Sequence, residues 1–402
     1  MKRIVAALLL VAPALFAQAP QPDGNDVYTR IELKDPQTSS FRVIQDVSET
    51  NEGAREHMML LWSGTQATDV KASDLMTGAA VTSALTVLKS MDGSMPALKV
   101  GLARAVPKNG QARIRVDMNV KNPQMFSLAG GIASFVLPFH NTRGTIVLPA
   151  GYELLSSKIP AQILTEADGR IAVSYMHQIA GEAPVTLTMK AGIQAKPPKA
   201  LTNARSWEPA GQKPTERARL TERATQDRDI VYFLLEPKTN AFALYHDYTE
   251  SRPGTDKYIN VVRAGSKASN PSAYILDTGE VLRHETLKGD AITAAKIDAG
   301  TVTPETEVVV IHFPPVKEGQ SIRLRISETY THPESYRLDE DELVFERNLG
   351  RARNSVVLPA GWYLTASSIP AIVRQTPDGR TRLDFVNGRP EGIDAYVKGK
   401  KR

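Results

Sequence analysis

The chain has 402 residues, a formal net charge of +5 and no cysteine. Hydrophobic residues make up 42% and charged residues 23%, proportions that are typical of folded globular proteins rather than disordered chains. Without cysteine the chain cannot form disulfides, thiolate metal sites or a cysteine nucleophile. At roughly 100–200 residues per domain, the length predicts two or three domains.

The first residues have the layout of a secretory signal peptide. Two basic residues precede an almost entirely apolar run at 4–16, and small residues follow at Ala17 and Ala19. This run is shorter than the roughly 20 residues of a membrane-spanning helix, which disfavours the alternative of an uncleaved signal anchor. We expect a signal peptide over residues 1–19 and an exported protein, periplasmic or extracellular. No transmembrane segment is expected after signal cleavage, which would follow either of the two alanines.

The rest of the sequence contains two copies of one repeated unit. Residues 147–170 align without gaps on 357–380, and 13 of these 24 positions are identical. A second block aligns at an offset of 201. Its recurring residues are Pro36, Thr38, Phe41, Asp46, Glu49, Gly53, Gly64, Leu75, Thr77 and Gly78 in the first copy. Between the blocks, Gly110-Gln111 recurs as Gly319-Gln320. A period of about 200 residues predicts a tandem domain duplication rather than a solenoid.

These offsets define repeat one as residues 26–191 and repeat two as 229–402. Repeat two has about eight extra residues between Gly279 and Gly319. The segment 192–228 is expected to be a basic, proline-containing linker, with eight basic and four acidic residues. Both repeats are close to neutral, whereas a nucleic-acid-binding domain carries its own basic face. No nucleic-acid partner is therefore expected.

Apolar and polar residues alternate with a period of two in both repeats. The pattern runs through 114–120 and 322–326, and a β-branched run at 307–313 precedes the second of these segments. Asp168-Gly169 and Asp378-Gly379 lie between strand-like runs, where Asp-Gly favours a tight hairpin turn. The predicted fold class is all-β, a tandem duplication of an antiparallel β-sandwich domain.

One segment also has a helical pattern. Residues 73–90 are the best helical candidate, but their start aligns on 274–279, which has the pattern of a strand and a turn. The alignment therefore favours a strand and a turn here too.

The order of motifs in repeat two follows that of a known sandwich. The motifs are LDTGEV at 276–281, VKEGQSIRLRISETY at 316–330, VVLPAGWYLTASSIP at 356–370, an Asp-Gly-Arg hairpin at 378–380 and a last strand near Tyr396. In this order each repeat resembles the N-terminal saddle-like β-sandwich of gluzincin aminopeptidases. The resemblance implies a sandwich that supports a separate zinc domain and has few catalytic groups. The zinc motif HExxH is absent, since His284-Glu285 is followed by Thr286, Leu287 and Lys288.

No motif in the sequence predicts a cofactor or a metal. Zinc sites usually have closely spaced histidine pairs, and none occurs here. Four histidines of repeat two could still converge in space, with Glu285 or Glu328 beside them: His246, His284, His312 and His332. Nucleophile-elbow and phosphate-binding motifs are also absent from the sequence. We expect no cofactor, no metal and no catalytic residues.

Paired carboxylates are the remaining catalytic candidates. Asp46 and Glu49 recur as Asp247 and Glu250, but residues present in both copies are first expected to serve the shared fold. The repeated arginines are expected to form an exposed strand face; they are Arg113, Arg115, Arg323 and Arg325.

Tyrosines distinguish the two copies. Nine of the twelve tyrosines lie from Tyr232 onward. Aromatic rings with a hydrogen-bonding group suit protein or glycan contacts, and equally the rim of a core. The predicted binding residues are Tyr245, Tyr248, Tyr258, Tyr330 and Tyr336. The sequence thus favours an exported, non-catalytic protein that binds a protein, peptide or glycan of the envelope or outside the cell. The alternative is a hydrolase, of peptidase or glycosidase type, with a site of scattered carboxylates or histidines.

Overall fold

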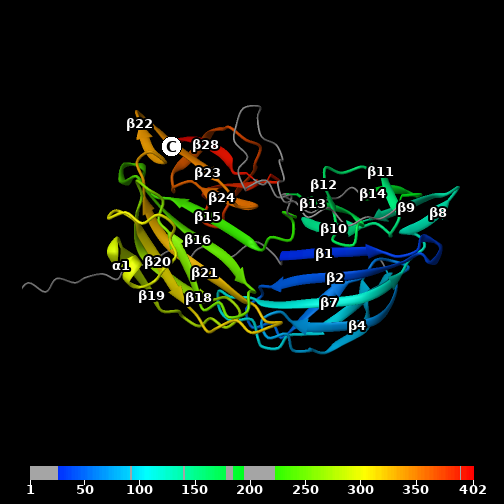
Figure 1. The fold of residues 1–402 in the computed structure, drawn as a ribbon. Helices are drawn as coiled ribbons and strands as arrows, with labels where there is room; N and C mark the ends of the chain where they lie inside the picture. The colour runs from blue at the N-terminus through cyan, green and yellow to red at the C-terminus, as the bar shows by residue number, and fades with distance from the viewer. Residues whose placement is uncertain (1–25, 91–92, 139–140, 178–183, 194–221, 390) are drawn as a thin grey trace, which may run out of the picture.

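The computed structural model describes residues 26–90, 93–138, 141–177, 184–193, 222–389 and 391–402 (Figure 1). The predicted signal peptide and most of the predicted linker, residues 194–221, lie outside these ranges. Within the described ranges, no helix is long and apolar enough to cross a membrane.

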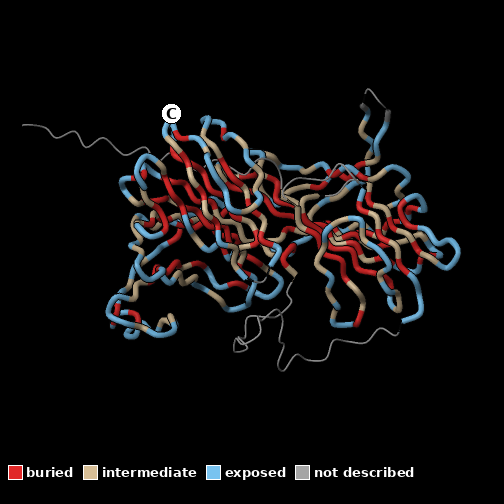
Figure 2. The backbone as a smooth tube through the Cα atoms, turned by 90° about the horizontal axis from the view of Figure 1, so that it is seen from above, coloured by how far each residue is buried: buried red, intermediate tan, exposed pale blue. Residues whose placement is uncertain are grey.

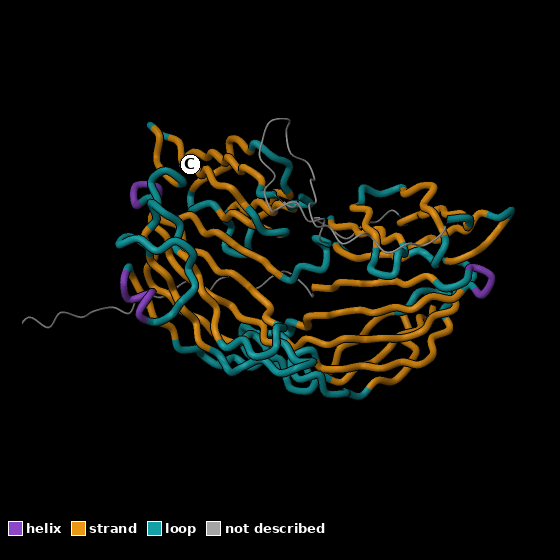
Figure 3. Tube along the Cα trace, in the orientation of Figure 1, coloured by secondary structure: helices purple, strands orange, loops and turns teal. Residues whose placement is uncertain are grey.

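Both halves of the molecule are built almost entirely from strands and have the same topology (Figure 3). Strands β1 to β14 fall in repeat one, and strands β15 to β28 form repeat two, whose first strand begins at Arg228, one residue before the predicted bound. Each repeat has one seven-stranded sheet, one four-stranded sheet and one three-stranded sheet. The predicted tandem duplication of an all-β sandwich is therefore confirmed.

The three sheets of repeat one face a common core. From edge to edge the seven-stranded sheet contains β12 (Gln162–Thr165), β13 (Ile171–Met176), β10 (Arg143–Val147), β1 (Asp26–Leu33), β2 (Ser40–Glu49), β7 (Ala112–Lys121) and β4 (Gln66–Asp74). The four-stranded sheet contains β11 (Tyr152–Ser157), β14 (Val185–Ala191), β9 (Ile132–Leu137) and β8 (Phe126–Ala129). The three-stranded sheet contains β3 (Glu56–Leu60), β6 (Gly93–Gly101) and β5 (Ser83–Ser90).

Repeat two has these strands in the equivalent order. Its seven-stranded sheet contains β26 (Ile372–Gln375), β27 (Thr381–Val386), β24 (Arg353–Val357), β15 (Arg228–Leu234), β16 (Ala241–Glu250), β21 (Ile322–Thr331) and β18 (Lys267–Ile275). Its four-stranded sheet contains β25 (Trp362–Ser367), β28 (Ile393–Lys401), β23 (Glu342–Leu349) and β22 (Tyr336–Asp339). Its three-stranded sheet contains β17 (Lys257–Val261), β20 (Glu307–His312) and β19 (His284–Lys288). The short helix α1 (Asp290–Ala294) lies in the extra residues that the alignment predicts for repeat two.

One strand pairing in each repeat departs from the antiparallel prediction. β1 pairs with β10 in parallel, and β15 pairs with β24 in parallel. Parallel neighbours need a long crossover connection. Here strands β2 to β9 separate the first pair in the chain, and strands β16 to β23 separate the second.

Equivalent aromatic residues fill the centre of both cores. Phe41 on β2 meets Phe135 on β9 edge to face, with 5.4 Å between ring centroids. The equivalent pair in repeat two, Phe242 and Phe345, has a centroid distance of 5.7 Å. All four rings are fully buried. The period-two pattern therefore places every second strand residue between the large sheet and the smaller ones.

The predicted turns form where glycine permits them. Gly169 has a φ of 86° in the β12–β13 hairpin, and Gly379 has a φ of 79° in the β26–β27 hairpin. The helical candidate at 73–90 is instead the end of β4, a turn and β5. Gly78 in that turn has a φ of 72°, a left-handed conformation that ends any helix across the segment.

The two halves meet through equivalent strand ends. In Figure 1, strands β1, β2 and β7 of one half run toward strands β16 and β21 of the other. Buried segments lie inside each half and also where the halves meet (Figure 2). The backbone N–H of Gln111 donates to the Leu276 carbonyl at 3.0 Å, and that of Ser321 donates to the Met76 carbonyl at 3.2 Å. The repeats are therefore joined by a nearly reciprocal exchange of backbone hydrogen bonds.

Glycine allows the close backbone approach at this junction. A Cβ atom on Gly110 would lie 2.4 Å from the Leu276 carbonyl oxygen and 2.5 Å from Cγ of Pro107. A Cβ atom on Gly78 would lie 2.7 Å from the Gly319 carbonyl oxygen. The Gly110-Gln111 and Gly319-Gln320 pairs that recur in the sequence thus lie where the copies touch.

We expect Gly110→Ala to lower the free energy of unfolding by about 1–3 kcal/mol, because the added methyl group overlaps a carbonyl oxygen. Chemical denaturation followed by circular dichroism measures this loss. The control is Gly388→Ala, whose Cβ would have nothing within 4 Å. Equal stability of the two variants would contradict the close approach.

Candidate functional site

Charged residues at equivalent positions of the two repeats gather at the junction. Asp26 begins β1 and its equivalent Asp227 directly precedes β15, while Arg143 and its equivalent Arg353 begin β10 and β24. Arg113 and Arg323 are likewise equivalent, each as the second residue of its strand, β7 and β21. Because the domain is duplicated, each of these charged residues is present twice at the junction.

Arg113 and Asp277 form a buried ion pair across the junction. The Arg113 Nε and Nη2 atoms donate to the two Asp277 carboxylate oxygens at 2.7 and 2.9 Å. The Arg113 side chain is 3% exposed and that of Asp277 is 0% exposed. Arg113 also donates to the backbone carbonyl of Ser321 at 3.2 Å. This bidentate geometry fixes one repeat against the other, since such pairs are directional as well as strong.

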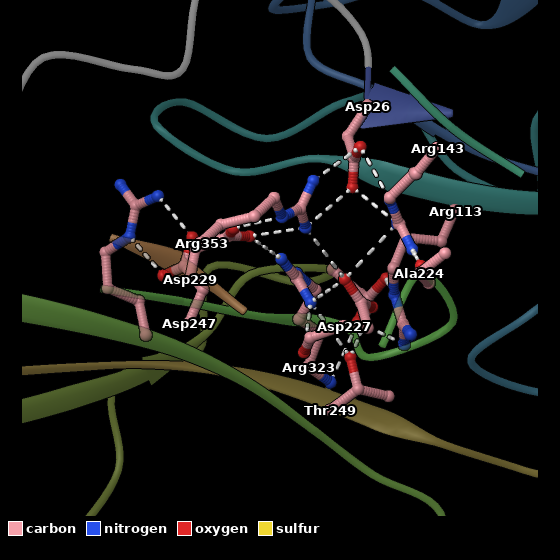
Figure 4. A network of polar contacts seen from close by, with 12 residues as sticks. Asp26, Arg113, Arg143, Ala224, Asp227, Asp229, Asp247, Thr249, Arg323 and Arg353 are labelled. Atoms are coloured by element: carbon pink, nitrogen blue, oxygen red, sulfur yellow. Dashed lines mark hydrogen bonds and ion pairs between the residues drawn. The ribbon is translucent and has the colours of Figure 1, made fainter. Parts of the chain in front are cut away.

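A second group of charges lies beside this pair (Figure 4). Asp26 accepts from Arg143 Nη2 at 2.7 Å and from Arg353 Nη1 of the other repeat at 2.8 Å. Asp227 lies 2.5 Å from Arg323 Nη1, and Asp229 accepts from Arg353 Nη2 at 2.9 Å. Burial alone would raise the pKa of Asp26, but the two arginines hold it well below its usual range. The junction thus keeps Asp26 ionised.

The three aspartates are also close enough to suggest a cation site. Asp26, Asp227 and Asp229 can place one carboxylate oxygen each within 4.8 Å of the others. Each of these carboxylates already has an arginine partner. Three guanidinium groups supply the positive charge that a metal would otherwise supply. The three carboxylates therefore fit an ion-pair network with these arginines, and we derive no metal chemistry from them.

The described end of the predicted linker lies against both repeats. Glu222 accepts from the Tyr28 hydroxyl at 2.9 Å and also from Thr145 and Ser174 of repeat one. Arg223 donates to backbone carbonyls of repeat two, those of Asn387 and Gly350. Residues 222–227 thus connect the repeats through their own contacts as well as through the chain.

A groove with a volume of about 810 Å³ opens between the repeats and this segment. Its charged lining is Arg30, Arg113, Arg115, Arg143, Arg228, Asp46 and Asp227. The arginines outnumber the aspartates, and polar side chains such as Gln226, Gln320 and Thr249 complete the wall. The groove is therefore polar and basic.

Most arginines of the groove already have acidic partners. Arg115 binds Asp46 with both carboxylate oxygens, at 2.7 and 2.8 Å, and Arg30 binds Glu32 and Glu166. Arg228 differs, because no acidic partner for it is found among the described residues. Its guanidinium carbon lies 4.5 Å from the centroid of the Tyr248 ring. Arg228 is thus the one arginine among the described residues of the groove lining whose charge no described carboxylate neutralises.

The predicted binding tyrosines lie inside repeat two. Tyr245, Tyr248, Tyr330 and Tyr336 are buried, and Tyr258 is half-buried. The Tyr248 ring lies against the Arg228 guanidinium group, and the Tyr336 hydroxyl donates to the backbone carbonyl of Leu235 at 2.6 Å. Their binding role stays a prediction, and their burial leaves little ring surface for a ligand.

The repeated carboxylates have the structural contacts expected of them. Asp247 binds Arg325 with both oxygens, at 2.7 and 2.8 Å, as Asp46 binds Arg115. The pKa of Glu250 would be raised by burial, but hydrogen bonds from Arg252 and Tyr248 lower it to about 2.

The prediction of an exposed arginine face is wrong for three of its four members. Arg113, Arg323 and Arg325 are buried, and only Arg115 is largely exposed. Burial is tolerated because carboxylates pair with each of the three.

The histidines of repeat two do not converge. Among the described residues, the three junction aspartates are the only group of three or more possible metal ligands. His312 Nε2 lies 2.7 Å from Glu285 Oε1 at the surface of the three-stranded sheet. His246 is buried elsewhere, 3.4 Å from the Tyr258 hydroxyl, and burial keeps its pKa well below the usual value.

Sequence reasoning missed the junction charges as a group. Asp26, Arg143 and their equivalents lie outside every aligned block, and no local motif surrounds them. Extending the two offsets to all charged positions would have paired Asp26 with Asp227 and Arg143 with Arg353. This alignment shows that these residues occupy equivalent positions in the two repeats. It does not show that the two repeats contact each other through them.

Comparisons with known proteins give only a weak fold-level likeness. No family model and no curated protein matches the chain. An aminopeptidase N family protein from Idiomarina loihiensis has 9% identity and a TM-score of 0.25, covering 42% of this chain and 29% of its own. The collagen adhesin from S. aureus has 8% identity and a TM-score of 0.17, covering 80% and 84%. This chain thus spans less than a third of the aminopeptidase family protein. The predicted resemblance to an aminopeptidase sandwich is found, and it is weak.

We expect Asp277→Asn to lower the free energy of unfolding by about 3 kcal/mol, because it leaves the buried Arg113 without its counter-charge. Urea denaturation measures the change. Asp46→Asn is the matched control, since the Asp46–Arg115 pair has the same geometry but an arginine that is 48% exposed. Asp46→Asn should lower the free energy of unfolding by less than about 1 kcal/mol. Similar losses for the two variants would refute the larger contribution of the buried Arg113–Asp277 pair to stability.

Glu328 gives the core of repeat two a dependence on pH. The side chain is buried, and burial raises its pKa above 4.5 despite hydrogen bonds from Asn260 and Tyr330. The folded chain therefore keeps a proton that the unfolded chain releases, so this group lowers stability as pH rises above 4.5. We expect Glu328→Gln, which cannot ionise, to gain stability relative to the wild type as pH increases.

Denaturation of the wild type and Glu328→Gln at pH 5 and pH 8 tests this expectation. Glu346→Gln is the control, because the Glu346 side chain is 58% exposed. A stability difference that does not change with pH would rule out the buried carboxyl as its source.

Proposed function

We propose that this chain is an exported, non-catalytic tandem β-sandwich protein whose inter-repeat groove binds an acidic peptide segment. The protein would act in the periplasm or outside the cell. In this proposal residues 1–19 are the signal peptide, 26–191 and 229–402 are the two domains, and 192–228 is the linker. The basic run, apolar run and small residues at the N-terminus support export.

The unpaired charge of Arg228 carries the proposal. An arginine that lines a groove without an acidic partner can form a bidentate contact with a carboxylate from outside. Tyr248 holds the guanidinium group in place from one side, which reduces the freedom that binding would remove. Asp46 and Asp227 in the same groove are both engaged by arginines. The arrangement therefore supports binding rather than acid–base chemistry.

The remaining lining favours a peptide over a glycan. Sugars commonly bind through exposed aromatic rings, and the only aromatic residue of the groove lining, Tyr28, is 8% exposed. Gln226, Gln320 and Thr249 instead offer donors and acceptors that suit the N–H and C=O groups of an extended chain. An acidic segment would match both these groups and the arginine excess.

Fluorescence anisotropy with a labelled octaglutamate peptide tests the proposal. We expect binding that weakens with added salt, and a Kd about tenfold higher for Arg228→Ala, the loss of one charge-assisted contact. Labelled octalysine should not bind.

Lys121→Ala is the matched control, because it removes one positive charge from the opposite end of β7 and outside the groove. Its Kd should remain within about twofold of the wild type. Equal affinity of the wild type and Arg228→Ala, with both folded by circular dichroism, would overturn the assignment of the groove.

A further inference from the structure

The three-stranded sheet of repeat one exposes unusually many large apolar side chains. Met58 and Leu60 on β3, Leu85 and Val87 on β5 and Met95 on β6 are all 40–59% exposed. On β5 the two residues lie on the same face, because strand residues two apart point the same way. Leu85 is 54% exposed and Val87 is 59% exposed.

β5 is also an edge strand. It pairs with β6 on one side, and no strand among the described residues pairs with its other side. The strand is eight residues long, and its only charged residue is Lys89. A long, mostly apolar edge with a single charge and no proline or bulge is a template for pairing with another strand.

The equivalent edge of repeat two is protected. The registers place Thr286 of β19 at the position of Leu85, and Lys288 at the position of Val87. β19 is only five residues long and includes Glu285 and Lys288. It ends at Lys288, and Gly289 then leads directly into α1. One copy thus has a short charged edge, whereas the other copy has a long apolar edge at the same place.

We propose that β5 pairs antiparallel with β5 of a second copy of this chain, joining two three-stranded sheets into one of six strands. A twofold axis through Thr86 would place Leu85 opposite Val87 of the partner subunit, and Ala84 opposite Leu88 of the partner subunit. All four exposed Leu85 and Val87 side chains would then pack on one face.

The charge pattern of β5 supports this register. Lys89 would lie opposite Ser83 of the partner subunit, so no two lysines face each other. A shift of two residues in one direction would place Lys89 opposite Leu85 of the partner subunit and leave apolar side chains unmatched. The strand is therefore complementary to itself in this arrangement, as a twofold contact requires.

Sedimentation velocity of the full chain from 1 to 100 µM tests the proposal. We expect a dimer that dissociates on dilution, with Val87→Lys raising the dimer Kd at least tenfold. Thr286→Lys, which adds the same charge to the protected edge, should leave the Kd unchanged. A monomer at every concentration, or a dimer that is unaffected by Val87→Lys, would overturn the pairing.

Cross-linking then reports the register directly, because the chain has no cysteine of its own. Thr86→Cys places one thiol beside its symmetry mate, so mild oxidation should give a disulfide-linked dimer. Thr286→Cys, an exposed thiol on β19, should remain a monomer under the same oxidation. Equal cross-linking of both variants, or none of Thr86→Cys, would refute the register.

Discussion

The buried ion pair between Arg113 and Asp277 constrains the whole molecule. Both charges are removed from water, so each depends on the other, and the two belong to different repeats. A pair of this kind tolerates little change of distance or angle. The position of repeat two relative to repeat one is therefore constrained by charge geometry together with the backbone hydrogen bonds of the junction.

The junction also explains what the duplication has kept and what it has changed. Asp26 contacts Arg353 across the junction and Arg143 reciprocally contacts Asp227, as residues of a twofold dimer interface would. Two substitutions break this symmetry: Asp229 takes the position of Tyr28, and Asp277 that of Met76. Each added aspartate neutralises arginines that the duplication had doubled. The asymmetry thus balances charge inside one chain, where a symmetric pair of copies would have an excess of arginine.

The strands could be predicted from the sequence because their signals are local. Alternation at 114–120 and the two Asp-Gly turns depend only on neighbouring residues, and the repeat itself supported each assignment. The site could not be predicted, because it depends on which surfaces of the two copies meet. Arg113 has the pattern of a solvated residue on an alternating strand, yet a carboxylate 164 positions away makes its burial favourable. The tyrosines are an ambiguous guide for a different reason, since an amphipathic ring suits a core rim as well as a surface.

The contacts of residues 222–227 have a consequence for how the protein responds to proteolytic cleavage. Glu222 binds repeat one and Arg223 binds repeat two, so contacts on both sides of the chain connection lie within the second fragment. A single backbone cleavage between 194 and 221 would separate two chains that still share the ion pairs and the backbone hydrogen bonds of the junction. The two repeats are thus natural halves for fragment complementation, in which separately produced chains reassemble the groove at a rate that depends on their concentration.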